Sequence, residues 1–76
     1  MTLDSMPTDV SARVVSVDTA DSGGLRLMEM GIVPGARVLV LNRAPLGDPI
    51  RIFVSNYHLA LRRKEASSIQ VALLNE

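Results

Sequence analysis

Residues 50–62 alternate apolar and polar side chains on either side of a two-residue break, and this pattern constrains the fold more than any other feature. In IRIFVS and YHLALR the apolar residues recur at every second position, which is the period of a strand with one buried face. The break falls at Ser55–Asn56, where Asn tolerates the left-handed conformation of a tight hairpin turn. The pattern predicts a hairpin. Its expected inward residues are Ile50, Ile52, Val54, Tyr57, Leu59 and Leu61, and its outward residues are Arg51, Phe53, Ser55, His58, Ala60 and Arg62.

Three further segments read as strands: residues 12–18, 36–42 and 69–74. The second is apolar on both faces, with Val38 and Val40 on one and Leu39 and Leu41 on the other, so we expect both faces to be covered, one of them by a helix. The last segment places Ile69, Val71 and Leu73 on one face. Five short strands in 76 residues are too few for a two-sheet sandwich. The sequence predicts a mainly β, single-domain chain (1–76) whose sheet closes into a small barrel.

One short helix is expected after the first strand. Asp21 or Ser22 can cap it, GLRLMEM favours the helical state, Gly31 ends it and Pro34 follows as a stop signal. RKEASS allows one further helical turn before the last strand. Four apolar residues of the first helix cannot all face inward, so one stripe packs on the sheet and another stays exposed. We predict a contact patch of Leu25 and Met28 beside Arg26, with burial in the core as an equal alternative for Met28.

The loop NRAPLGDPI holds an apolar residue among turn formers. Pro45, Gly47, Asp48 and Pro49 suit a stiff turn, but turn chemistry does not explain Leu46. The favoured interpretation is that Leu46 folds back and plugs an open end of the barrel. In the alternative, the rigid loop presents Leu46, beside Asp48, to a partner at little entropic cost.

The composition of the chain bears on its cellular location and on the charge of its partners. The chain has no cysteine, no signal-peptide pattern at its beginning, and apolar runs such as Val38–Leu41 that are far shorter than the roughly 20 residues of a membrane span. We expect a cytoplasmic protein with no direct membrane insertion. Net charge is zero, but residues 31–64 carry six bases against Asp48 alone, which indicates a solvated strand face or a basic patch for an acidic partner.

Several function classes lack the residues they need. The only histidine, His58, lies at an outward position, and no nucleophile, base or carboxylate pair is evident, so we expect no catalytic site and no enzyme. His58, Asp48 and Glu65 lie in separate segments, so we expect no metal ligands and no cofactor. Two aromatic residues and zero net charge argue against nucleic acid and against an aromatic groove for polyproline peptides.

Two runs together resemble a known family. RLMEMGIVPGARVLVLNRAPLGDPIRIFV followed by YHLALRRKEASSIQV is similar to the FeoA family (ferrous iron transport protein A), and the likeness extends from about Leu3 to Leu73. Pro7–Asp9 and Asn56 stand where the family commonly has glycine, and both substitutes suit turns. The most specific residues are Met30, Gly31, Pro34 and Gly35, the loop Pro45, Gly47 and Pro49, and Ala60, Leu61 and Arg62.

The resemblance implies a fold and a partner. It implies an SH3-like barrel and a non-enzymatic accessory protein that docks on the cytosolic GTP-binding portion of a FeoB-type iron transporter. Leu25, Arg26, Met28, Leu46 and Asp48 are the predicted partner-binding residues. Two alternatives stay open: a generic adaptor that self-associates weakly or binds peptides, and a metal-sensing regulatory domain.

Overall fold

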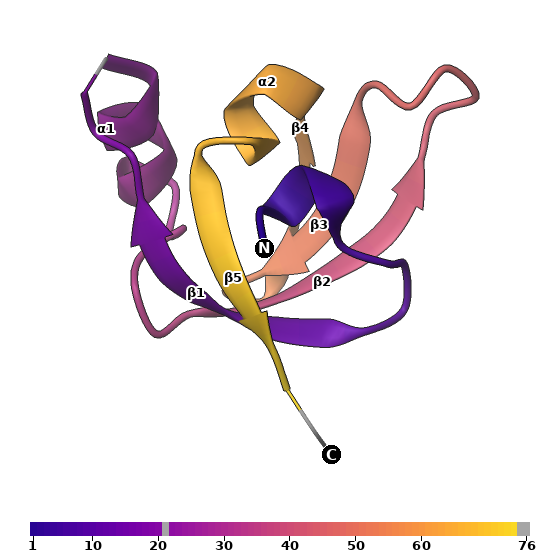
Figure 1. Cartoon of the computed structure of the whole chain (residues 1–76), viewed down its shortest axis with the longest axis horizontal. Helices are drawn as coiled ribbons and strands as arrows, with labels where there is room; N and C mark the ends of the chain where they lie inside the picture. The colour runs from indigo at the N-terminus through magenta and orange to yellow at the C-terminus, as the bar shows by residue number, and fades with distance from the viewer. Residues whose placement is uncertain (21, 75–76) are drawn as a thin grey trace.

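The computed structural model describes residues 1–20 and 22–74. Its elements are a 3₁₀ turn η1 (Leu3–Ser5), β1 (Ser11–Val17), α1 (Ser22–Glu29), β2 (Arg37–Arg43), β3 (Ile50–Val54), β4 (Tyr57–Leu61), α2 (Arg63–Ala66) and β5 (Ile69–Leu73). Each predicted strand and helix is present, with bounds displaced by at most two residues. Figure 1 shows the strands wrapped around a small interior, with both helices toward one end.

The five strands form one antiparallel sheet in the order β4-β3-β2-β1-β5. No ladder joins β4 to β5 within the described residues, so the sheet curves into a barrel without closing by strand pairing. The beginning of the chain covers the outer edge of β5, where Thr2 bridges to Gln70 and the Val71 N–H donates to the Met1 carbonyl at 2.8 Å. Bulges in β1 and β2 interrupt the register and help the sheet to bend.

The core lies between the inner faces of the strands and the helical segments. In β3 the predicted alternation is confirmed, with the inward residues buried and the outward ones exposed. In β2 the expectation of two covered faces is wrong, because Leu39 and Leu41 are only half-buried while Val38 and Val40 are buried. The buried residues are Leu3, Met6, Ala12, Val14, Leu27, Ile32, Val38, Val40, Ile50, Ile52, Val54, Leu61, Ala66, Ile69 and Val71.

Two residues predicted to face the core are exposed. Tyr57 and Leu73 have exposed fractions of 39% and 41%. Both lie at an end of an edge strand, Tyr57 at the start of β4 and Leu73 at the finish of β5, where only one neighbouring strand supplies cover. The alternating sequence pattern predicts which face of the sheet a side chain points to, but it does not predict whether another element covers that side chain.

Helix α1 ends in a glycine cap, as predicted. Gly31 has φ +95°, its N–H donates to the Met28 carbonyl, and the Ile32 N–H donates to the Leu27 carbonyl. This is the Schellman pattern, and the two residues between which an apolar contact usually accompanies it, Leu27 and Ile32, are both buried in the core. At the other end, Ser22 is the first helical residue, and Asp21, the other predicted cap, lies outside the described residues.

The substituted turns use non-glycine residues in left-handed conformations. Ser55 and Asn56 have φ of 52° and 67°, which joins β3 to β4 by the predicted two-residue hairpin turn. Asp9 has φ 60°, so it adopts before β1 the left-handed conformation that a glycine would adopt readily. Both substitutions are therefore compatible with the fold.

Candidate functional site

Leu46 does not plug the barrel. Its side chain is 94% exposed, so the favoured interpretation is wrong and Leu46 points into solvent. The Gly47 N–H donates to the Ala44 carbonyl at 2.7 Å, and the Ala44 N–H donates to the Pro49 carbonyl at 3.1 Å. These two bonds close the loop at its base, with Pro45 and Leu46 at the centre of the tighter turn. An exposed leucine therefore stands on a short, internally bonded loop.

Asp48 connects this loop to α2. Its Oδ1 accepts a hydrogen bond from the Arg63 N–H at 3.0 Å, and Arg63 is the first residue of α2. The carboxylate therefore satisfies one of the N–H groups that a helix leaves unpaired at its beginning. The structure gives Asp48, predicted as a partner contact, a positioning role as well.

Helix α1 is also connected to α2, through an ion pair. Arg26 donates from Nη2 to Glu65 Oε2 at 2.7 Å, while Glu65 Oε1 accepts from the Arg62 N–H at 2.9 Å. Leu25, next to Arg26, has an exposed side chain, and Met28 is half-buried. The predicted exposed stripe of α1 is thus centred on Leu25, and Met28 contributes only its rim.

Helix α2 therefore joins the two predicted contact segments into one surface. We call this the cap surface: Leu25 and Met28 of α1, Leu46 of the 44–49 loop, and Arg62, Arg63 and Lys64 at α2. Figure 1 shows α1, α2 and the loop along the same upper edge of the barrel. The three consecutive cations are exposed. Sequence reasoning did not place them in the site, although the run RRK was a visible signal.

The predicted structural residues lie at turns. Gly35 and Gly47 have φ of +93° and +84°, a region that L side chains rarely adopt. Gly35 donates its N–H to the Val14 carbonyl at 2.8 Å, which aligns the chain for β2 beside β1. Pro34 precedes it in an exposed turn, and Pro49 follows Asp48 through a cis peptide bond.

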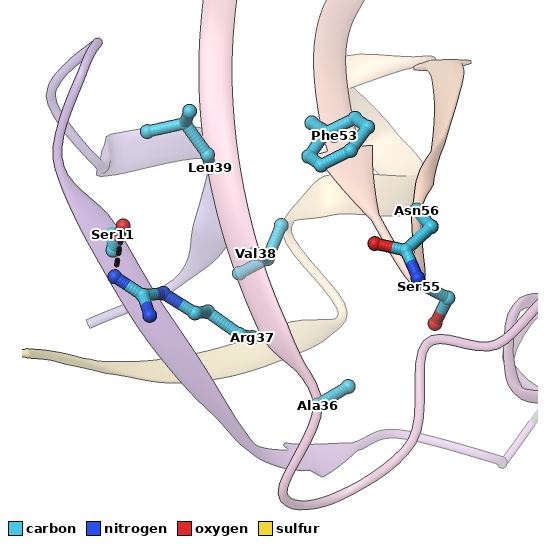
Figure 2. Close-up of a pocket in the computed structure, with 8 residues that line it drawn as sticks. All are labelled: Ser11, Ala36, Arg37, Val38, Leu39, Phe53, Ser55 and Asn56. Carbon is cyan, nitrogen blue, oxygen red and sulfur yellow. Dashed lines mark hydrogen bonds between the residues drawn. The ribbon is translucent and has the colours of Figure 1, made fainter.

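A second concave region lies on the outer face of the sheet. We call it the outer groove; it has a volume of about 500 Å³ and is lined by Ser11, Ala36, Arg37, Val38, Leu39, Phe53, Ser55 and Asn56. Figure 2 shows Leu39 and Phe53 on neighbouring strands, with Arg37 reaching Ser11 Oγ at 3.3 Å. His58 is exposed, as predicted, and packs edge-on against Phe53 with ring centroids 5.1 Å apart.

The described residues show no clustered metal ligands and no unpaired buried polar side chains. Across residues 1–20 and 22–74, no three His, Cys, Asp or Glu side chains gather closely enough to hold a metal ion. In the same part of the chain, every buried side-chain nitrogen and oxygen has a hydrogen-bond partner. Neither α1 nor α2, nor any other helix within these ranges, has the length and hydropathy to cross a bilayer.

Comparison with known proteins places this architecture in a family. Residues 1–73 match the FeoA domain model. The chain is 35% identical over 75 residues to an Fe(2+) transport protein A/Fe(2+) transporter FeoB fusion protein of Porphyromonas gingivalis, covering 99% of this chain and 9% of the fusion protein. The chain therefore spans only a small part of that relative.

Solved structures agree in fold. The FeoA protein of Chlorobium tepidum is 40% identical with a TM-score of 0.90, over 99% of this chain and 71% of that one. A zinc complex of Stenotrophomonas maltophilia FeoA, described as a prokaryotic SH3 domain protein, is 36% identical with a TM-score of 0.84, over 95% and 89% of the two chains. The strand order, the helix after β1 and the helical turn before β5 are thus those of an SH3-like barrel, and the chain belongs to the FeoA family of ferrous iron transport proteins.

Proposed function

We propose that this protein is a cytoplasmic, non-enzymatic accessory factor of ferrous iron uptake that docks on the cytosolic GTP-binding portion of a FeoB-type transporter. The observation that carries the proposal is the Porphyromonas gingivalis relative, in which a segment resembling almost all of this chain is part of one polypeptide with FeoB. Covalent fusion holds two domains at high effective concentration, which is useful when they act together. Domains that act together in this way also associate through a docking surface.

The cap surface is our candidate for that docking surface. Leu46 offers an apolar anchor that is already fixed by the loop bonds, so binding would immobilise little additional chain. Full burial of a leucine side chain contributes about 1.5–3 kcal/mol. Arg62, Arg63 and Lys64 add positive charge beside it, which favours an acidic surface on the transporter.

Docking on two conformations of the transporter with different affinities would bias its nucleotide cycle. A factor of this kind needs no catalytic group of its own. Its effect equals the difference between the two binding free energies, and a tenfold preference for one nucleotide state corresponds to about 1.4 kcal/mol.

The test is an isothermal titration of the isolated cytosolic portion of the cognate transporter with wild-type protein and with Leu46→Ser, in GTP-analogue and GDP states. We expect Leu46→Ser to weaken binding about tenfold or more, and the wild-type affinity to differ between the two states. Val15→Ser is the matched control, because Val15 is also an exposed apolar residue but lies on β1 and is not part of the cap surface. Equal loss in both variants would reject the cap surface, and no binding of wild type would reject direct docking on this portion.

A further inference from the structure

Charge is segregated in this fold. None of the five strands contains Asp or Glu, whereas β1, β2 and β3 contain four arginines. Arg43 reaches back to the beginning of the chain, where Nη2 donates to the Asp4 and Met6 carbonyls at 2.9 and 2.6 Å. The other three, Arg13, Arg37 and Arg51, are exposed on the outer face of the sheet. Within residues 1–20 and 22–74, Asp and Glu lie in turns, loops and helical segments, so the strands themselves contribute arginines and no carboxylates.

The outer groove lies within this basic face, and its floor is apolar. Leu39 and Phe53 are paired in the register of β2 and β3, and Ser11 pairs with Leu39 from the β1 side. Leu39 is half-buried and Phe53 is 36% exposed, so both present apolar surface that the fold leaves partly uncovered. None of the eight described residues that line the groove is Asp or Glu.

The register sets the spacing of the charges around this floor. Arg37 precedes Leu39 by two residues on β2, and Arg51 precedes Phe53 by two residues on β3. Because β2 and β3 are antiparallel, the two arginines lie on opposite sides of the Leu39–Phe53 pair along the strand direction. Each is displaced by about 6.6 Å, the rise of two strand residues. Along the strand direction, the outer face therefore presents Arg37, the Leu39–Phe53 pair and Arg51 in that order, each two residues from the next.

We propose that the outer groove binds an extended acidic segment of a protein partner, with a large apolar side chain seated between Leu39 and Phe53 and an Asp or Glu two residues away on each side. An extended chain repeats every two residues, so its acidic side chains reach Arg37 and Arg51 when the apolar one occupies the groove. This binding site is distinct from the cap surface and goes beyond the proposed docking on the transporter.

The face suits an acidic peptide better than nucleic acid. Binding of single strands relies on successive bases stacking on several aromatic side chains. Among the described residues that line the groove, Phe53 is the one aromatic side chain, and its ring already packs against that of His58. Guanidinium groups spaced on each side of an apolar floor match carboxylates on alternate residues.

The experiment is selection of a random 12-residue peptide library displayed on phage against the immobilised protein. We expect enrichment of peptides with a large apolar residue flanked at two positions on each side by Asp or Glu. A synthetic copy of the enriched peptide should shift the amide NMR signals of Leu39 and Phe53, and its affinity should fall several-fold between 50 and 300 mM salt. No enrichment, or a consensus without acidic residues, overturns the proposal.

Charge exchange then tests the pairing directly. Arg37→Glu should weaken the selected peptide at least fivefold, and replacing the facing acid of the peptide by Lys should restore binding to that variant but not to wild type. Lys64→Glu on α2 is the control, since it makes the same charge change outside the groove. Equal loss in both variants, failure of the exchange, or tighter binding of a single-stranded oligonucleotide of matched charge would overturn the assignment. Arg51→Glu repeats the test on the other side.

Discussion

Arg43 should hold the N-terminal segment against the barrel. Its Nη2 atom donates to two main-chain carbonyls, those of Asp4 at 2.9 Å and Met6 at 2.6 Å. Leu3 and Met6 in the same segment are completely or almost completely buried, at 0% and 1% exposed. The guanidinium therefore fixes a segment that supplies two large side chains to the core.

The cost of removing it can be worked from these contacts. A hydrogen bond from a charged donor contributes about 1.5–3 kcal/mol, so two contribute about 3–6 kcal/mol. Holding the arginine side chain still costs up to about 2 kcal/mol of rotamer entropy, and water can reach part of this half-buried site. We therefore expect Arg43→Met to lower the free energy of unfolding by about 2 kcal/mol. For a domain of this size, that corresponds to a fall in Tm of about 8–16 °C.

The assay is urea unfolding followed by circular dichroism, with thermal melts beside it. Arg43→Lys should recover part of the loss, because an ammonium group can reach one carbonyl but lacks the planar fork. Arg51→Met is the control, since Arg51 is an exposed arginine on the neighbouring strand. An Arg43→Met protein within 0.5 kcal/mol of wild type, or one no less stable than Arg51→Met, would show that Arg43 does not hold the N-terminal segment in place.

Three other substitutions test how the helices are positioned. Gly24→Ala should destabilise the fold by about 3 kcal/mol or prevent folding, because a Cβ there would lie 1.9 Å from the Asp18 carbonyl oxygen; a folded NMR spectrum with near wild-type Tm would contradict this. Gly31→Ala should cost about 1–2 kcal/mol in urea unfolding because of its φ of +95°, and an unchanged midpoint would be inconsistent with the cap. Asp48→Ala should lower the free energy of unfolding by about 1 kcal/mol and speed amide hydrogen exchange at Arg63, because the Arg63 N–H donates to the Asp48 carboxylate. Unaltered exchange at Arg63 would show that this hydrogen bond contributes nothing.

The parts of the fold that depend on local chemistry could be predicted from the sequence. Gly31 is predicted as a helix end and has the left-handed conformation that this role needs. Ser55–Asn56 is predicted as a tight turn from its place between two alternating segments, and the register of β3 with β4 confirms it. In each case a few neighbouring residues determine the backbone, so the sequence contains the necessary information.

The parts of the structure that depend on contacts between distant segments could not be predicted from the sequence. Whether Leu46 turns inward depends on the bonds that close its loop and on what lies opposite, and neither can be read from its neighbours. The ion pair between Arg26 and Glu65 joins residues 39 positions apart. The cap surface arises only when α2 meets both α1 and the loop, so sequence reasoning found two of its segments and missed the third.

An amide NMR titration of this protein with the cytosolic GTP-binding portion of its cognate FeoB-type transporter would determine whether the proposed cap surface docks there. It is run with GTP analogue, with GDP and without nucleotide, with ferrous iron alone as a separate arm. We predict shifts or broadening at Leu25, Leu46 and Arg62–Lys64 that depend on the nucleotide. Spectra that stay unchanged at near-millimolar partner, or shifts caused by iron alone, would contradict the proposed docking.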